Sequence, residues 1–215
     1  SSDLCLFIFR KKKERDDVWV KAVIFDLNGV FLKSEFLSDR MQKSYGVKTE
    51  DFLPALKEIM GKARMPGVDD SYALWKPYLT EWGVEITQKE FFQFWFSGES
   101  LAQELVDYAS QLRENDLEVF ILSNNFRERT EFYREHFPEL FEAVNNAYFS
   151  WETGFVKPDE EAFRNILEKN DLNPEDCVYF DDSSSNVATA NLLGIHAQKY
   201  EGLEKTKATI EALLQ

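Results

Sequence analysis

The chain is poor in positive charge. Its 25 lysines and arginines are outnumbered by 39 aspartates and glutamates, which leaves a net charge of −14 at pH 7. Nucleic acids and anionic membranes are themselves polyanions, so this surplus argues against either as the main partner. The chain also has no apolar run long enough to cross a bilayer, since the LCLFIF run near the N-terminus is far too short. The cations of RKKKERDD follow that run, whereas in a signal peptide they precede it, and we expect residues 1–17 to form a tail.

Cysteine and histidine are equally scarce, with two of each. Cys5 and Cys177 are far apart, and Cys177 falls in a predicted strand, where a buried thiol is expected rather than a disulfide. This composition suits a reducing compartment, and we expect a cytoplasmic protein. His136 and His196 stand apart from the polar motifs described below, so the sequence has no Cys/His zinc spacing and no Ser-His-Asp arrangement. A Walker-type glycine loop is also absent.

What the chain does have is the composition of a soluble globular protein, with 44% hydrophobic and 30% charged residues. A buried strand is predicted at 18–27, followed by a stretch at 31–98 that has helical periodicity and no second strand of similar quality. That stretch is too long for a structureless loop. We therefore predict a small helical domain at 33–98, inserted into a core formed by 18–32 and 99–215.

Beyond the predicted insertion, strands and helices alternate. This order is typical of a parallel sheet with right-handed crossovers and helices on both faces, which is an α/β fold in three layers. We predict strands at 117–122, 147–149, 177–180 and 195–200. We predict helices at 101–112, at 127–138, from Pro158 onward, at 187–193 and at 203–214.

Four polar motifs accompany the predicted elements, and they contain Asp26, Ser123, Lys157 and the Asp181–Asp182 pair. Three of them follow an apolar stretch, which places them at the carboxyl ends of parallel strands, where α/β proteins bind ligands. Together, a nucleophilic carboxylate, a hydroxyl, an ammonium and an acidic pair could handle a phosphoryl group and Mg²⁺. Taken singly, each residue also fits a plainer role as a turn residue, a helix cap or a solvated surface group.

The order of these motifs resembles that of the haloacid dehalogenase-like hydrolase superfamily. The resemblance covers about 18–32 and 99–200, and the insertion between the first two motifs is similar to that superfamily's helical cap. Members of this kind are mostly Mg²⁺-dependent phosphatases and phosphomutases, with some dehalogenases. The resemblance implies a Rossmann-like core with a small inserted helical cap.

For the reaction, the resemblance implies that Asp26 is the nucleophile and becomes an aspartyl phosphate. Ser123 and the backbone N–H of Asn124 would bind the phosphoryl oxygens, and Lys157 would stabilise the nucleophile and the transferred group. Arg64 lies in a GKAR segment that we predict as a loop between helices of the insertion. It is a candidate substrate contact, and an ordinary surface arginine is the alternative.

For the metal, the resemblance implies Mg²⁺ bound by Asp26 and Asp182, with Asp181 ligating it or holding its waters, and by the backbone carbonyl of Asn28. Asn28 departs from the family pattern, since the phosphatases carry an aspartate there as general acid and base. An amide cannot exchange a proton at neutral pH, so we expect turnover to fall by about 10²–10⁴-fold. Three explanations stay open: a natural slow or non-hydrolytic member, an engineered change that traps the phosphoenzyme, or another group that supplies the proton.

The sequence leaves three functions open. The first is a Mg²⁺-dependent phosphohydrolase that acts on a small phosphorylated metabolite and is impaired by Asn28. The second is a catalytically weak or inactive phosphatase-like binding protein. The third is a haloacid dehalogenase, in which Asp26 attacks carbon; the acidic pair counts against it, because that chemistry needs no cation. If the insertion closes over the core as in relatives, hinges are expected near 31–34 and 97–100.

Overall fold

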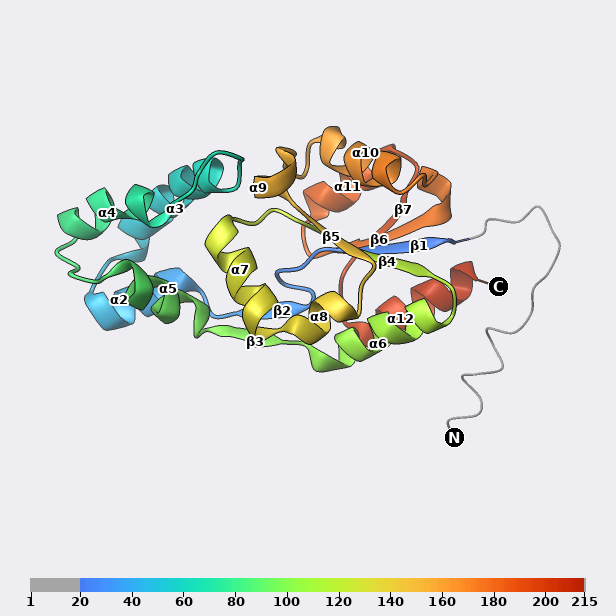
Figure 1. Ribbon diagram of the computed structural model, residues 1–215, viewed down its shortest axis with the longest axis horizontal. Coiled ribbons are helices and arrows are strands. Elements are labelled where there is room, and N and C mark those ends of the chain that lie inside the picture. Colours follow the sequence, from blue (N-terminus) through green and yellow to red (C-terminus); the bar gives the residue numbers. More distant parts are fainter. Residues whose placement is uncertain (1–19, 215) are drawn as a thin grey trace.

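The protein is elongated, with a β-sheet and its helices at one end and a group of helices at the other (Figure 1). The structure is a computed structural model that describes residues 20–214. The predicted tail at 1–17 and Cys5 lie outside the described residues. None of the helices within 20–214 combines the length and the apolar content that a membrane span requires.

A five-stranded parallel sheet forms the centre of the core, in the order β5-β4-β1-β6-β7. β1 lies in the middle, and its AVIF sequence is buried throughout, as a strand covered on both faces requires. Phe25 of β1 stands opposite Ile121 of β4 and Phe180 of β6. The predicted α/β fold is therefore confirmed. The strands of this sheet are β1 (Ala22–Phe25), β4 (Glu118–Ser123), β5 (Asn146–Phe149), β6 (Cys177–Asp181) and β7 (His196–Lys199).

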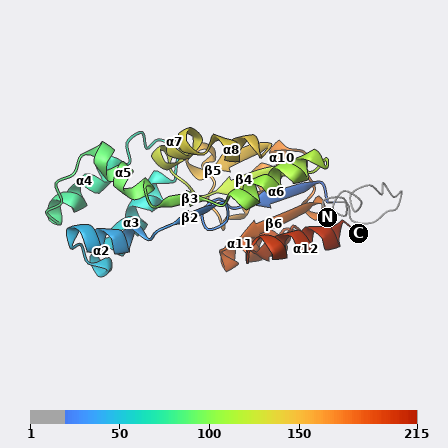
Figure 2. The same cartoon turned by 90° about the horizontal axis from the view of Figure 1, so that it is seen from below.

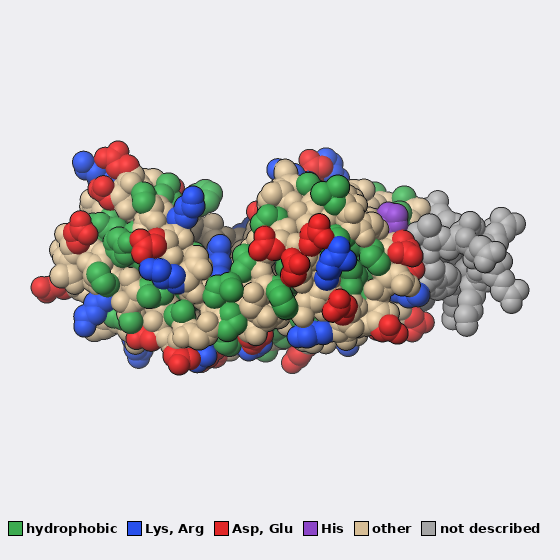
Figure 3. Space-filling view, turned by 90° about the horizontal axis from the view of Figure 1, so that it is seen from above, with side chains coloured by type: hydrophobic (Ala, Val, Ile, Leu, Met, Phe, Trp, Pro, Cys, Tyr) green, Lys and Arg blue, Asp and Glu red, His purple; other side chains and the backbone are tan. Residues whose placement is uncertain are grey.

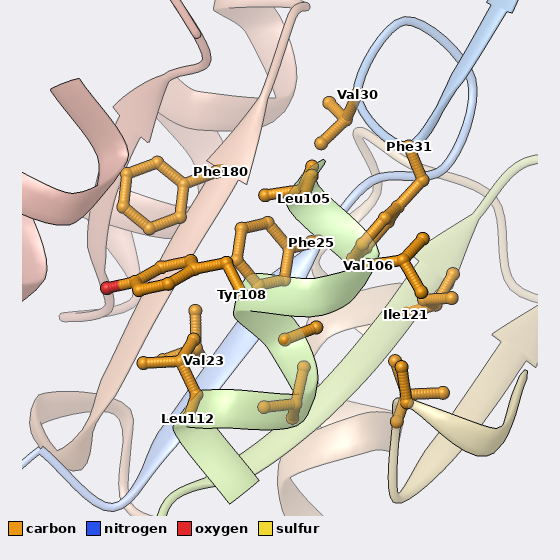
Figure 4. Close-up of a cluster of buried hydrophobic side chains, with 14 of the residues drawn as sticks. Val23, Phe25, Val30, Phe31, Leu105, Val106, Tyr108, Leu112, Ile121 and Phe180 are labelled. Atoms are coloured by element: carbon orange, nitrogen blue, oxygen red, sulfur yellow. The ribbon is translucent and has the colours of Figure 1, made fainter. Parts of the chain in front are cut away.

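Helices cover both faces of this sheet (Figures 1 and 2). One face packs against α6 and α12 through a cluster in which Phe25 and Phe180 stack 5.5 Å apart, and Figure 4 shows the side chains of α6 that reach it. The other face packs against α10 and α11, where Phe163 meets Tyr179 edge-on at 5.3 Å. The helices of the core are α6 (Gln103–Glu114), α7 (Arg127–His136), α8 (Pro138–Glu142), α9 (Ser150–Thr153), α10 (Glu160–Lys169), α11 (Ser184–Leu192) and α12 (Leu203–Leu213), together with the 3₁₀ turn η1 (Pro174–Asp176).

Helices α2 to α5, which we call the helical insertion, pack around an apolar cluster of their own. Phe52 stacks on Trp75 at 5.4 Å, and Trp75 meets Trp95 at 5.7 Å, so the aromatics of this segment form the core of a helix bundle. Phe126, the residue before α7, joins the cluster and ties it to the rest of the molecule. The predicted domain boundaries at 33 and 98 stay a prediction. The four helices are α2 (Leu37–Tyr45), α3 (Thr49–Ala63), α4 (Tyr72–Glu81) and α5 (Gln88–Phe96).

Two short strands connect the helical insertion to the core, β2 (Leu32–Ser34) and β3 (Glu99–Leu101), and they pair in antiparallel fashion. The sequence prediction missed both strands and wrongly placed Leu101 in a helix, because a strand of three residues is too short to show a period. The predicted hinges near 31–34 and 97–100 fall on this ribbon, and their movement stays a prediction.

Several helix ends also differ from the prediction, including those near Arg64 and Pro158. α3 continues through Ala63, and the N–H of Arg64 donates to the carbonyl of Met60 at 3.2 Å, so most of the GKAR segment is helix rather than loop. α10 begins at Glu160, because Pro158 still belongs to the preceding turn. Cys177, predicted to be a buried thiol, is indeed buried.

We predict that Phe52→Ala destabilises the protein by about 3–5 kcal/mol, the usual cost of removing a buried aromatic ring. Phe52 is completely buried and stacks on Trp75. Leu53→Ala is the matched control, because Leu53 is the next residue of α3 and is 48% exposed. Its effect should stay within about 0.5 kcal/mol. Urea denaturation followed by circular dichroism measures both changes, and equal losses would contradict a packed core in the helical insertion.

Candidate active site

Three of the predicted site residues stand where strands of the parallel sheet end. Asp26 follows β1, Ser123 is the last residue of β4, and Asp181 is the last residue of β6. β1 lies between β4 and β6, so the three residues share the carboxyl edge of the sheet, where α/β proteins bind ligands. That edge faces the helical insertion (Figures 1 and 2).

The side chain of Lys157 joins two of these strand ends. Its ammonium nitrogen lies 2.8 Å from Oδ1 of Asp26 and 2.7 Å from Oδ2 of Asp181. All three side chains are withdrawn from water, with exposed fractions of 2% for Lys157, 11% for Asp26 and 0% for Asp181. Buried charges require partners of this kind, because the desolvation of an unpaired ion is costly. Two carboxylates around one ammonium still leave one negative charge without a partner.

Asp181 is held from several sides. Its carboxylate accepts hydrogen bonds from the backbone N–H of Ser183 at 2.7 Å, from the side-chain amide of Asn186 at 2.9 Å and from the hydroxyl of Tyr179. The Tyr179 hydroxyl in turn accepts a hydrogen bond from the Lys157 ammonium at 3.0 Å. Because each donor fixes an oxygen of Asp181, this carboxylate is a rigid anchor for the ammonium.

The two carboxyl groups that flank Lys157 have opposite pKa shifts. Burial raises the pKa of Asp26 to about 6, against the opposing charge of Lys157. Burial also acts against the ionised form of Asp181, but the charge of Lys157 and the hydrogen bonds to Asp181 outweigh it and hold the pKa of Asp181 below its usual value. Asp181 therefore favours its ionised form more strongly than Asp26 does. A divalent cation beside Asp26 would favour its carboxylate form, which is the form that can act as a nucleophile.

Asp182 adds a third carboxylate. Asp26, Asp181 and Asp182 each offer an oxygen within 4.8 Å of the other two. Asp182 can occupy this position because Gly29 has no side chain: a Cβ there would lie 2.3 Å from Oδ2 of Asp182. Gly29 also has a φ of +88°, which only glycine adopts readily. Hard oxygen ligands of this kind suit Mg²⁺, and the surplus negative charge of the cluster fits a divalent cation.

Asn124 holds the backbone of Lys157 in place. Its side-chain amide donates to the carbonyl of Lys157 at 2.7 Å, and its side-chain oxygen accepts from the N–H of Lys157 at 2.9 Å. These two bonds tie the end of β4, where Ser123 is buried, to the segment that carries the ammonium. The sequence prediction used only the backbone N–H of Asn124 and missed this function of its side chain.

Asn28 points toward helix α7. Its side-chain N–H donates to the hydroxyl of Tyr133 at 2.8 Å, while its Oδ1 is buried and has no partner among residues 20–214. Burial raises the pKa of Tyr133, so this hydroxyl keeps its proton. Next to it, Arg129 pairs with the buried Glu99 of β3 at 2.5 Å. The amide of Asn28 is therefore fixed on one side and leaves an oxygen available for a further donor.

Arg64 reaches the same region from the helical insertion. It follows the last residue of α3, and its electrostatic neighbours are Arg129 and Asp26 of the core. Figure 3 shows a hollow between the two parts of the molecule, with Lys and Arg side chains inside it. Arg64 is therefore close enough to the site for the charge of Asp26 to act on it.

Three supporting residues escaped the sequence analysis: Tyr179, Asn186 and Tyr133. Tyr179 could have been found, because it stands two residues before Asp181 in a strand and so points to the same side of the sheet. Asn186 lies in the first turn of α11, where polar side chains commonly reach back toward the start of the helix. Tyr133 gave no such signal, because its contact with the site is made from a separate helix.

Comparison with known proteins identifies the family. The model of the haloacid dehalogenase-like hydrolases matches residues 20–194. The chain belongs to this family. The match extends from the start of β1 to the end of α11, and the resemblance seen in the sequence is confirmed. A stretch of 106 residues, 49% of the chain, is 32% identical to part of acyl-CoA dehydrogenase family member 10 of Mus musculus and spans only 10% of that protein.

Solved structures share the fold of this hydrolase at lower sequence identity. A family enzyme of Bacteroides thetaiotaomicron in complex with magnesium and inorganic phosphate has a TM-score of 0.74 at 22% identity, over 85% of this chain and 94% of that one. A haloacid dehalogenase-like hydrolase of Porphyromonas gingivalis has a TM-score of 0.73 at 23% identity, over 91% and 98%. An L-2-haloacid dehalogenase has a TM-score of 0.62 at 15% identity, over 83% and 85%. The fold alone therefore does not choose between a phosphatase and a dehalogenase.

We predict that Lys157→Met lowers the free energy of unfolding by about 3–5 kcal/mol at neutral pH without divalent cations, because it leaves two buried carboxylates unpaired. Urea denaturation measures the loss. Lys21→Met is the matched control: Lys21 also pairs with an aspartate, Asp176 at 2.6 Å, but is 51% exposed, and exposed pairs contribute little. Similar losses in both variants would contradict the central position of Lys157 in the site.

Proposed function

We propose that this protein is a Mg²⁺-dependent phosphohydrolase that acts on a small phosphorylated metabolite through an aspartyl phosphate. The observation that carries the proposal is the buried lysine between two carboxylates, with a third carboxylate beside them. This group offers a nucleophile, a cation for the transferred group and a metal site in one place. A cytoplasmic location belongs to the same proposal.

Mg²⁺ would be held by Asp26, Asp181 and Asp182, with the backbone carbonyl of Asn28 as a further ligand. When bound, it would neutralise charge on the phosphoryl oxygens and favour the carboxylate form of Asp26. The clustered oxygens within 4.8 Å of one another support this assignment. The related Bacteroides thetaiotaomicron enzyme, which holds magnesium and phosphate on the same fold, supports it as well.

In the first step, an oxygen of Asp26 attacks the phosphorus, the bond between phosphorus and the leaving oxygen breaks, and the leaving group takes a proton from water. Ser123, the backbone N–H of Asn124 and the Lys157 ammonium would stabilise the charge on the phosphoryl oxygens. In the second step, water attacks the phosphorus and the bond to Asp26 breaks. Inorganic phosphate leaves, the water's proton passes to solvent, and the carboxylate is restored.

Asn28 leaves both steps without a side chain that exchanges a proton. Its amide, fixed by the Tyr133 hydroxyl at 2.8 Å, can orient a water molecule or a leaving group through the buried Oδ1 but cannot take up or deliver a proton. The proposed consequence is a slow enzyme. When the leaving group is a good one, the first step needs no acid, so the second step, hydrolysis of the aspartyl phosphate, is the one that is slowed most.

Two alternatives have their own support. A catalytically inactive binding protein is favoured by Asn28 alone. In a haloacid dehalogenase, Asp26 would attack a carbon atom, and that reaction needs no metal ion. The cluster of three carboxylates would then have no function, so this alternative is the weaker one.

We predict that Asn28→Asp raises the turnover of an alkyl phosphate with Mg²⁺ by about 10²–10⁴-fold, because it supplies a general acid and base. With an aryl phosphate, the present chain should instead accumulate an aspartyl phosphate, detectable in the mass of the intact protein, and Asn28→Asp should not. Stopped-flow measurement of product release separates the two steps.

The control for this experiment is Asn28→Ala, which removes the amide without supplying an acid and should gain nothing. If Asn28→Asp is no faster than Asn28→Ala in either step, position 28 does not carry the acid–base function. If no variant hydrolyses any phosphate ester while Mg²⁺ still binds, the binding protein becomes the better description.

We also predict that Gly29→Ala weakens Mg²⁺ binding by about 10–100-fold, the loss typical when the groups that orient metal ligands are disturbed. The added Cβ would displace the carboxylate of Asp182. Gly67→Ala is the matched control, because Gly67 has the same φ of +88° but nothing within 4 Å of its Cβ position. Titration calorimetry with Mg²⁺ measures both, and equal affinity in the two variants would remove Asp182 from the metal site.

A further inference from the structure

Arg64 belongs to the helical insertion, whereas Asp26 belongs to the core, and the charge of Asp26 nevertheless acts on Arg64. Arg64 directly follows α3, and the loop after it packs against the core. In this loop, the ring of Pro66 lies 3.6 Å from the point that a Cβ on Gly154 would occupy. Gly154 is three residues before Lys157 in the sequence. The segment that carries Arg64 is therefore seated on the segment that leads to the buried ammonium.

Arg64 differs from the other arginines that the structure describes. Each of the others has an acceptor: Arg40 with Glu35, Arg113 with the carbonyl of Glu142, Arg127 with Asp69, Arg129 with Glu99, Arg134 with Glu152 and Arg164 with Glu160. The side chain of Arg64 has no ion pair or hydrogen bond within 20–214, and its Nε is buried. In a chain with a net charge of −14, a guanidinium left without an acid is available for an anion from outside.

The charged residues that act on Arg64, Arg129 and Asp26, belong to the candidate site. Burial and the charge of Arg129 act to lower the pKa of Arg64, while the charge of Asp26 acts in the opposite direction. A guanidinium nevertheless keeps its proton at any physiological pH. Arg129 forms an ion pair with Glu99, and Lys157 forms ion pairs with two carboxylates. Among these three cations, Arg64 is therefore the one without an ion pair.

The position of Arg64 distinguishes it from the partners of the phosphoryl group. In the proposed function these partners are Ser123, Asn124 and Lys157, which all belong to the core. The leaving part of a substrate would extend from there toward the helical insertion, where Arg64 stands. A planar guanidinium binds either a carboxylate or a phosphoryl group through two parallel hydrogen bonds, so the geometry does not separate the two ligands. The charge does, because the single charge of Arg64 neutralises one carboxylate, whereas a second phosphoryl group carries nearly two charges.

We infer that Arg64 binds a carboxylate of the substrate, so that the protein takes small phosphomonoesters that also carry a carboxylate. This inference rests on the proposed function, because it requires a phosphoryl group at Asp26. It adds the substrate class, and it assigns Arg64 as the residue that selects it.

Affinity for phosphonates tests the inference without requiring turnover. In the presence of Mg²⁺, titration calorimetry compares phosphonocarboxylates of increasing chain length with the alkylphosphonates that lack the carboxyl group. We expect one phosphonocarboxylate to bind about 10–100-fold more tightly than its partner, the range of a charge-assisted pair. Arg64→Gln should abolish this preference and leave the affinity for the alkylphosphonate unchanged. Arg64→Lys should retain part of it, because it keeps the charge but loses the planar fork.

Arg134→Gln is the matched control. It removes the same charge from α7, where Arg134 pairs with Glu152 at 3.0 Å, and it should leave the preference intact. A wild-type protein without a preference would overturn the inference. So would Arg64→Gln if it weakened both ligands equally, because Arg64 would then bind the phosphoryl group itself. A bisphosphonate that binds more tightly than every phosphonocarboxylate would overturn the choice of a carboxylate.

Hydrolysis assays separate failure of this inference from failure of the proposed function. If the chain or Asn28→Asp hydrolyses phosphate esters with no preference for those that carry a carboxylate, only the inference fails. If neither protein hydrolyses any phosphate ester and no phosphonate binds, the proposed function and the inference fail together.

Discussion

The ammonium of Lys157 is the group on which the rest of the site depends. Asp26 and Asp181 end neighbouring strands, and two buried carboxylates this close cannot both stay ionised without a cation between them. Neither strand supplies this cation, because the residues before the two carboxylates, AVIF in β1 and CVYF in β6, are uncharged. It comes from a separate segment, and the side chain of Asn124 fixes that segment by binding both its N–H and its carbonyl. A buried cluster of one ammonium and two carboxylates therefore lies at the centre of the candidate site.

The parallel sheet explains why residues so far apart in the sequence meet. β1 lies in the middle, with β4 on one side and β6 on the other, so the residues that follow these strands stand next to each other at one edge. The chain passes from the core into the helical insertion after β1 and returns to the core before β4, and the β2–β3 ribbon carries both crossings. In the proposed function, a substrate at Asp26 would therefore be met by the core from one side and by the insertion from the other. The proposed chemistry and the proposed selectivity would then be supplied by different parts of the chain.

The sequence was sufficient for the parts of the structure that repeat a local pattern. Buried strands appear as apolar runs, so the α/β fold and the position of Asp26 and Asp181 at strand ends could be predicted. The β2–β3 ribbon could not, because its strands have three residues each and their pairing joins positions on either side of the insertion. The two hydrogen bonds between Asn124 and Lys157 could not be predicted either, nor could the hydrogen bond between Asn28 and Tyr133. Each depends on how separate elements pack, and no spacing in the sequence records it.

The surroundings of Asn28 match an amide rather than a carboxylate. Tyr133 accepts the hydrogen bond of the Asn28 side chain, and its own proton is directed toward Glu99. An aspartate at position 28 would compete for the proton of this hydroxyl with the buried Glu99, which is already paired with Arg129. Burial and the neighbouring negative charge would raise the pKa of such an aspartate, so it would hold a proton more readily than a solvated one. The same pocket that accommodates the amide would therefore favour the protonated state that a general acid needs.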